Sequence, residues 1–271
     1  MPILYVVATP IGNLEDISLR ALRVLREVKL IAAEDTRKTK RLINKYDIKT
    51  PLTSFHEYTK TPKLNRILEH LQEGDIALVS EAGMPGISDP GYEIVTAAIQ
   101  RGISVVPIPG PSVVTAALAI SGLPTDRFTC LGFLPSRASG RRRLLERVVS
   151  EPSTLVILEA PHRLTASMTD MLAILGDRKL AVCRELTKLH EEVFRGSISQ
   201  ALEHFTKPRG EFTLVIEGKQ AKVNPQLTDE IEQWLKQMRR SGLPAREAIA
   251  KVAGETHLSK KELYQAWLRL V

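Results

Sequence analysis

The sequence predicts an α/β protein with two α/β domains, followed by a small helical module. In the first half, short apolar runs rich in β-branched residues alternate with segments of helical periodicity. A second series of this kind occupies residues 154–217, and beyond residue 225 the strand pattern stops. The expected domains are residues 1–123, 124–223 and 224–271.

Four strands are predicted in the first domain, and each is continuously apolar instead of alternating. They cover residues 3–8, 30–33, 76–80 and 103–107. Continuous apolar strands are typical of a sheet with helices on both faces. Between the first two strands, residues 17–28 repeat apolar positions at helical spacing, which predicts a covering helix.

Residues 123–141 are rich in Gly, Pro, Ser and Arg and are expected to link the two α/β domains. The second domain is expected to hold a helix at residues 164–175, with strands at residues 154–159, 179–184, 192–194 and 212–217. The tail is expected to form three short helices, separated by residues 241–244 and 256–259.

Composition and charge narrow the possible functions. Of the 271 residues 43% are hydrophobic and 25% are charged, which excludes a disordered or collagen-like chain. Lys and Arg outnumber Asp and Glu by 38 to 31, and a net charge of +7 suits a polyanionic partner.

No apolar run could span a bilayer and no signal peptide is evident, so we expect a cytoplasmic protein without membrane contact. Its two cysteines form no CxxC pair, and no metal site is expected.

Three loops rich in glycine and proline follow predicted strands: residues 9–13, 80–91 and 109–112. Ligands of open α/β sheets bind beyond the carboxyl ends of the strands, so a shared ligand crevice is favoured over three unrelated turns. Neither the GxGxxG nor the GxxxxGK[ST] pattern occurs, which removes the main support for a nicotinamide oxidoreductase or a P-loop NTPase.

Eight motifs in this order carry a specific resemblance: TPIGNLED from residue 9, AEDTR from 33, SEAGMPGISDPG from 80, PGPS from 109, GFLP from 132, APHR from 160, RELTK from 184 and GEFTLVIEG from 210. The chain resembles the ribosomal RNA small subunit methyltransferase I family, within the tetrapyrrole methylase-like group of S-adenosylmethionine-dependent methyltransferases. The resemblance covers residues 4–218, and the helical tail is similar to the C-terminal module of that family.

The resemblance implies two domains that enclose S-adenosylmethionine in a cleft, and 2'-O-methylation of a cytidine ribose in 16S rRNA of the small ribosomal subunit. It also implies a homodimer. Where family members often carry Asp and Thr, this chain has Glu81 and Met84, which leaves open whether the Glu81 carboxylate contacts the donor. By the same resemblance, the donor contacts fall on Pro10, Gly12, Ala82, Gly83, Ile87, Ser112, Val113, Glu159, Arg184 and Val215.

A ribose hydroxyl is a weak nucleophile, so a carboxylate or neutral histidine could accept its proton during methyl transfer. At the end of the second predicted strand, Asp35 is suited to cap the next helix, and the longer Glu34 is suited to reach the cleft. For Asp89, the alternative to a catalytic role is to stabilise a turn or to cap a helix. For His162, the alternative is a surface position. The candidate catalytic residues are Glu34, Asp35, Asp89 and His162, with Glu159 and Glu185 as further carboxylates.

Residues 136–150 hold five arginines and one glutamate and give the strongest signal for a polyanion. A solvated helix face is the competing interpretation. Arginine forks suit phosphate oxygens, and a second basic group spans residues 37–41. The candidate RNA contacts are Arg37, Arg137, Arg141, Arg142 and Arg143.

Two other functions remain open on sequence grounds. One is a small-molecule methylase of the same fold that acts on a tetrapyrrole. The other is a non-catalytic RNA-binding assembly factor that keeps the fold without using the donor. The basic clusters and the helical tail favour ribosomal RNA as the partner.

Overall fold

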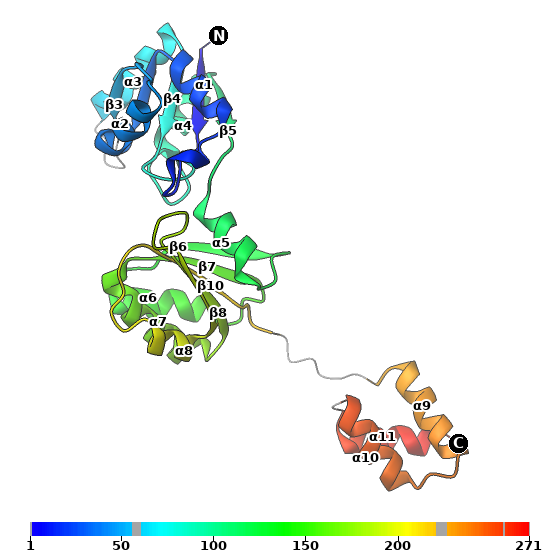
Figure 1. Cartoon of the computed structure of the whole chain (residues 1–271). Coiled ribbons are helices and arrows are strands. Elements are labelled where there is room, and N and C mark those ends of the chain that lie inside the picture. Colours follow the sequence, from blue (N-terminus) through cyan, green and yellow to red (C-terminus); the bar gives the residue numbers. More distant parts are fainter. Residues whose placement is uncertain (1, 56–60, 221–226, 257, 271) are drawn as a thin grey trace. The chain divides into compact units, whose positions relative to one another are not determined.

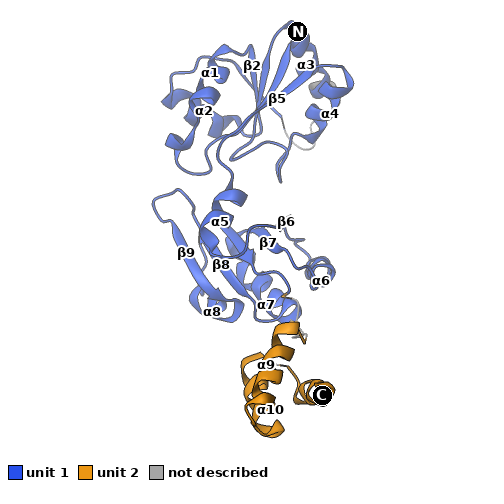
Figure 2. Ribbon diagram, turned by 90° about the vertical axis from the view of Figure 1, so that its right-hand side faces the viewer, with its two compact units in different colours: residues 1–219 blue, residues 220–271 orange. Residues whose placement is uncertain are grey.

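The computed structural model describes residues 2–55, 61–220, 227–256 and 258–270. The chain divides into two compact units, residues 1–219 and residues 220–271 (Figure 2). The first unit contains two sheets, and the second contains helices. The expected boundary between residues 223 and 224 lies outside the described residues.

The first sheet has the strand order β3-β2-β4-β1-β5, and all of its pairings are parallel. Its strands are β1 (Ile3–Val7), β2 (Leu30–Ala33), β3 (Leu52–Ser54), β4 (Ile76–Val79) and β5 (Ser104–Ile108). Four of them were predicted; β3 was missed because three residues give no recognisable pattern. The parallel arrangement brings the carboxyl ends of β1, β2 and β4 to one edge.

Helices cover both faces of this sheet, as its continuously apolar strands predicted (Figure 1). One face packs against α1 (Leu19–Glu27) and α2 (Thr36–Lys45), and the other against α3 (Thr61–Glu73) and α4 (Tyr92–Gln100). All four residues of the central β4 are buried. A rigid apolar core therefore fixes the strand ends from which the glycine-rich loops emerge.

The second sheet is mixed, with the order β6-β7-β10-β8-β9, and only the β6–β7 pair is parallel. It is formed by β6 (Phe128–Phe133), β7 (Thr154–Glu159), β8 (Lys179–Arg184), β9 (Glu192–Ser197) and β10 (Phe212–Ile216). Strand β6 lies in the segment that was expected to be a linker. A register shift between Cys130 and Gly132 interrupts its regular pattern.

Four helices pack on this second sheet. One face carries α6 (Ala138–Arg147), α7 (Leu164–Leu175) and α8 (Ile198–His204), and the other carries α5 (Val113–Ser121) (Figure 1). On the α5 side, Ile11 from the loop after β1 joins a cluster with Val156, Ala181 and Val215. The loops of the first sheet therefore contact the second sheet through a buried apolar cluster.

The helical tail contains three helices, as predicted: α9 (Asp229–Arg240), α10 (Ala245–Thr256) and α11 (Lys260–Arg269). Leu235, Val252 and Leu263 are fully buried in its core. The Arg239 guanidinium donates hydrogen bonds to the carbonyl oxygens of Trp267 (2.9 Å) and Leu270 (2.6 Å), which satisfies the end of α11. Among the described helices, none is both long and apolar enough to cross a membrane.

Candidate active site

The three glycine-rich loops meet at the carboxyl edge of the first sheet. Thr9 and Gly83 exchange two backbone hydrogen bonds, each 2.9 Å between nitrogen and oxygen. A side chain at Gly83, whose φ is +81°, would begin 3.8 Å from the carbonyl oxygen of Pro111. The loops after β1, β4 and β5 thus form one continuous surface and are not independent turns.

A cavity of about 360 Å³ opens beside this surface, a size in the range of small-ligand sites. Helix α2 and loops that flank strands of both sheets contribute to it, and its charged lining consists of three cations and two carboxylates. The lining residues are Thr9, Pro10, Ile11, Gly12, Leu14, Lys38, Thr39, Arg41, Leu42, Ser80, Glu81, Ala82, Lys188 and Glu211. Of the predicted donor contacts, Pro10, Gly12 and Ala82 are among them.

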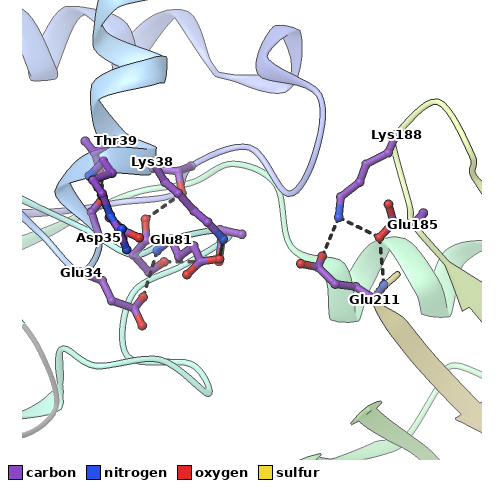
Figure 3. Close-up of polar contacts among 12 residues, drawn as sticks. Glu34, Asp35, Lys38, Thr39, Glu81, Glu185, Lys188 and Glu211 are labelled. Atoms are coloured by element: carbon purple, nitrogen blue, oxygen red, sulfur yellow. Dashed lines mark hydrogen bonds and ion pairs between the residues drawn. The ribbon is translucent and has the colours of Figure 1, made fainter. Parts of the chain in front are cut away.

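Sequence reasoning missed Lys188 and Glu211, which reach this cavity from the second sheet. Both belong to motifs quoted for the resemblance, at residues 184–188 and 210–218, and that was the available signal. Lys188 Nζ lies 3.0 Å from Glu185 Oε1 and 2.8 Å from Glu211 Oε2 (Figure 3). On the first-sheet side, Lys38 forms an ion pair with Glu81.

The remaining predicted donor contacts lie around the cavity or away from it. Gly83 borders it through its pairing with Thr9, and Ser112 and Val113 lie at the start of α5. The Ile87 side chain is 59% exposed, whereas Val215 is fully buried in the cluster that contains Ile11. None of these five lines the cavity.

Glu159 and Arg184 are engaged within the second domain. The Glu159 carboxylate, 2% exposed, accepts hydrogen bonds from Ser167 Oγ (2.5 Å) and from the backbone nitrogen of Ala160 (2.9 Å). Arg184 donates to the carbonyl oxygen of Arg209 and to the Glu192 carboxylate, at 2.8 and 2.9 Å. Both side chains have structural partners, and their contact with the donor stays a prediction.

Asp35 caps the next helix as expected, whereas Glu34 does not reach the cavity beside the glycine-rich loops. Asp35 caps α2 by accepting a hydrogen bond from the backbone N–H of Arg37 at 2.8 Å, and this bond lowers the pKa of the Asp35 carboxyl. Glu34 Oε2 accepts a hydrogen bond from the backbone N–H of Glu81 at 3.0 Å (Figure 3). The longer carboxylate thus reaches the loop that follows β4.

A second cavity, of about 410 Å³, is lined by Glu34, Asp35, Thr36, Arg37, Ser54 and Glu81. Glu81 lines both cavities, so the Lys38–Glu81 ion pair lies where the two adjoin. Glu34 faces the second cavity and does not line the first.

Asp89 is the carboxyl group in this region whose pKa departs most from the ordinary value. Burial and the nearby Glu34 charge raise the pKa of Asp89 to about 6, against a hydrogen bond from Ser80 that lowers it. A carboxyl group with a pKa near neutrality is suited to exchange a proton. His162, by contrast, is exposed in the turn Pro161–Arg163 and lines neither cavity.

The arginine cluster separates into two pairs. Arg141 is only 6% exposed, and its Nε donates to Asp170 Oδ2 at 2.7 Å; Arg142 Nε donates to the other oxygen of the same carboxylate at 2.7 Å. The expectation that Arg141 contacts phosphate is therefore corrected, because its guanidinium is enclosed in the core.

Arg137 and Arg143 line a cavity of about 400 Å³ at the start of α6, and neither forms an ion pair within the described residues. Arg37 is exposed beside Asp35.

Comparison with known proteins identifies the family. Residues 3–202 match the family model of the Tetrapyrrole (Corrin/Porphyrin) Methylases. The chain belongs to the tetrapyrrole methylase family. Outside this tetrapyrrole methylase region, residues 225–270 match the family model of the RsmI C-terminal HTH domain.

Curated relatives match this tetrapyrrole methylase over nearly its whole length. A protein of Halalkalibacterium halodurans named ribosomal RNA small subunit methyltransferase I is 46% identical, with 97% of this chain and 94% of the relative covered. Its namesake from Thermotoga maritima is 52% identical over 80% of this chain and 99% of the relative.

Solved structures show the same fold at lower identity. Diphthine synthase superimposes with a TM-score of 0.64 at 16% identity, covering 80% of this chain and 90% of the other. Uroporphyrin-III-C-methyltransferase from Thermus thermophilus gives a TM-score of 0.57 at 20% identity, covering 79% and 94%. The two-domain fold of the tetrapyrrole methylases is thereby confirmed.

S-adenosylmethionine is the methyl donor of this family, and the cavity of about 360 Å³ at the glycine-rich loops is the candidate site for it. Gly12 has no side chain, which allows residues 186–188 to approach the loop after β1 at this cavity. On the first-sheet side of the cavity, the Glu81 carboxylate and the Lys38 and Arg41 side chains can pair with the α-ammonium and carboxylate of the donor. Backbone N–H and C=O groups of the surrounding loops can replace part of the hydration of the ligand.

Proposed function

We propose that the chain transfers a methyl group from S-adenosylmethionine to the ribose 2'-hydroxyl of a cytidine in 16S rRNA of the small ribosomal subunit. The observation that carries this proposal is the 46% identity, over 97% of the chain, to a ribosomal RNA small subunit methyltransferase I. The family model matches residues 3–202, which include every lining residue of the cavity except Glu211.

The chemistry requires alignment and the removal of one proton. The sulfonium donor is already electrophilic when bound, so the protein has to hold the hydroxyl oxygen in line with the methyl group and exclude water. As the oxygen–methyl bond forms and the methyl–sulfur bond breaks, the hydroxyl proton passes to a base. Glu34 and Asp89 are the proposed acceptors, because they interact with each other at the edge where the loops meet.

The proposed RNA contacts are the exposed arginines Arg37, Arg137, Arg142 and Arg143. Their guanidinium groups can form paired hydrogen bonds to phosphate oxygens. A cytoplasmic location is also proposed, because the proposed substrate is ribosomal. A homodimer is also proposed, supported by Tyr92 and Ile99 on α4, which are 73% and 61% exposed and one heptad apart.

Transfer of a labelled methyl group tests the function against its alternatives. The purified chain is incubated with labelled donor and, in separate reactions, with unmethylated 16S rRNA, small subunits or a tetrapyrrole. Labelled 2'-O-methylcytidine in the digested RNA is the expected product. A labelled tetrapyrrole would instead establish the small-molecule methylase, and RNA binding without any labelled product would establish the assembly factor.

A further inference from the structure

The loop between β8 and β9, residues 185–191, has an unusual backbone. Glu185 and Thr187 adopt φ values of +50° and +67°, a region that residues with side chains seldom occupy. Such conformations persist only where surrounding contacts impose them, and they concentrate at functional sites. The contacts of this loop are therefore informative.

Hydrogen bonds within the second domain hold the loop in this shape. Glu185 Oε1 accepts from the backbone nitrogen of Glu211 at 2.9 Å, and the backbone nitrogen of Thr187 donates to Glu191 Oε2 at 2.6 Å. A Cβ at Gly210 would lie 2.5 Å from Cγ of Glu185. The β10 side of the sheet thus accommodates the loop only because residue 210 is a glycine.

The same loop is packed against the first domain. The backbone nitrogen of Asn13 donates to Thr187 Oγ1 at 3.0 Å. A Cβ at Gly12 would lie 2.6 Å from Lys188 Cγ and 2.6 Å from Thr187 Oγ1. Lys188 is consequently held beside residues 9–12, which line the donor cavity.

The Lys188 ammonium has one N–H group that is available for a further hydrogen bond. Of its three N–H groups, one is used by Glu185 and one by Glu211, and no third acceptor is found within the described part of the chain. Burial disfavours the charged form, but the two carboxylates outweigh it and raise the pKa of Lys188. Lys188 therefore stays protonated, and it can donate a hydrogen bond but cannot accept the ribose proton.

We propose that Lys188 donates its remaining hydrogen bond to an oxygen of the acceptor nucleotide and so orients the 2'-hydroxyl toward the methyl donor. This inference rests on the proposed function. The neighbouring residues place the acceptor here: Leu189 is 92% exposed and His190 is exposed, so a large substrate can approach Lys188 from solvent. In the same cavity, the loops of the first sheet at residues 9–12 and 80–82 remain available for the methyl donor.

The test compares Lys188→Met with Lys207→Met, which removes an exposed lysine that lines none of the three cavities described above. Donor affinity is measured by calorimetry without RNA, and single-turnover methylation is measured with saturating small subunits. For Lys188→Met we expect the affinity for S-adenosylmethionine to stay within about twofold of that of the parent. The methylation rate should be about 10²-fold lower, as is typical when one preorganised hydrogen-bond donor is lost. Lys207→Met should match the parent in both.

A parental rate for Lys188→Met would overturn the inference, and so would a donor affinity that falls in step with the rate. If Lys188→Met fails to fold, Lys188→Gln replaces it, because the glutamine amide can still donate hydrogen bonds to Glu185 and Glu211 without the charge. The same two measurements on Lys188→Gln then test the inference. Absence of methyl transfer by the parent chain would overturn the proposed function instead. Once the parent is active, the Lys188 variants test this inference alone.

Discussion

The carboxylate of Glu34 accepts a hydrogen bond from the backbone N–H of Glu81, with 3.0 Å between Oε2 and nitrogen. This bond joins the end of β2 to the loop that follows β4, so Glu34 contributes to the position of that loop. It also brings a negative charge close to Asp89, whose pKa it helps to raise. Structural and chemical roles of Glu34 therefore have to be separated by experiment.

Glu34→Gln achieves this separation, because the amide oxygen of glutamine can still accept the N–H of Glu81. We expect the melting temperature and the affinities for donor and RNA to match the parent. If Glu34 accepts the ribose proton, the single-turnover rate should fall about 10²–10⁴-fold. Glu27→Gln, which changes an exposed glutamate paired with Arg23, is the control and should leave the rate unchanged. A Glu34→Gln rate within a few-fold of the parent would rule Glu34 out as the base.

The raised pKa of Asp89 predicts a pH-dependent stability. The ordinary pKa of an aspartate is 3.8 and that of Asp89 in the folded chain is about 6, so the folded state binds the proton more tightly than the unfolded state does. This contribution is fully present below about pH 4 and is lost as the pH rises through about 6.

Asp89→Asn imitates the protonated carboxyl and should remove this dependence. The free energy of unfolding, measured with urea between about pH 4 and 7, should decline less with rising pH in the variant than in the parent. Asp126→Asn, an exposed change, controls for the loss of one charge. Parallel pH curves for the parent and Asp89→Asn would contradict the proposed environment of Asp89.

Gly12→Ala should disturb the donor cavity, because its Cβ would lie 2.6 Å from two side-chain atoms of the 185–191 loop and 2.9 Å from the Leu186 carbonyl oxygen. The loop has to move away, and donor affinity in calorimetry should fall at least tenfold. At Gly254, in α10, a Cβ meets nothing within 4 Å, so Gly254→Ala should leave donor affinity unchanged and stabilise the helix by about 0.5–1 kcal/mol. Equal donor affinities for the two variants would show that the close approach at Gly12 is unimportant.

The sequence allowed the fold and the meeting of the glycine-rich loops to be predicted, because both depend on local patterns. Continuous apolar strands indicated the covered parallel sheet, and glycine and proline marked the loops at its edge. Lys188 and Glu211 escaped notice because their place at the cavity depends on how β8 and β10 pair in the second sheet. Arg141 could have been recognised: it precedes Leu145 by four residues, on the buried face of α6.

Arg137 and Arg143 are expected to contribute most to RNA binding by the cluster, because Arg141 is buried against Asp170 and the exposed Arg142 is paired with the same carboxylate. Replacing both with glutamine should weaken RNA affinity and reduce the slope of log affinity against log salt by about one for each lost phosphate contact. Donor affinity should not change. Arg147→Gln, at the end of the same helix, is the control. An unchanged salt slope in the double variant would identify this surface as a solvated helix face.

Arg141 should matter for stability and not for RNA. Its guanidinium contacts Asp170 Oδ2 at 2.6 and 2.7 Å, and both side chains are less than 10% exposed. Burial alone would raise the pKa of Asp170, but hydrogen bonds from Arg142 and Arg141 hold it below its usual value. Arg141→Met leaves that carboxylate with Arg142 as its remaining ionic partner.

Breaking a buried pair on one side costs about 3–5 kcal/mol, and the exposed Arg142 can recover only part of this. We therefore expect Arg141→Met to lower the free energy of unfolding by about 2–4 kcal/mol in urea denaturation. The double variant Arg141→Met with Asp170→Leu should recover much of the loss, because no buried charge is left unpaired. At a temperature where Arg141→Met remains folded, its RNA affinity and salt slope should equal those of the parent. A reduced salt slope in the folded variant would return Arg141 to the RNA-binding surface.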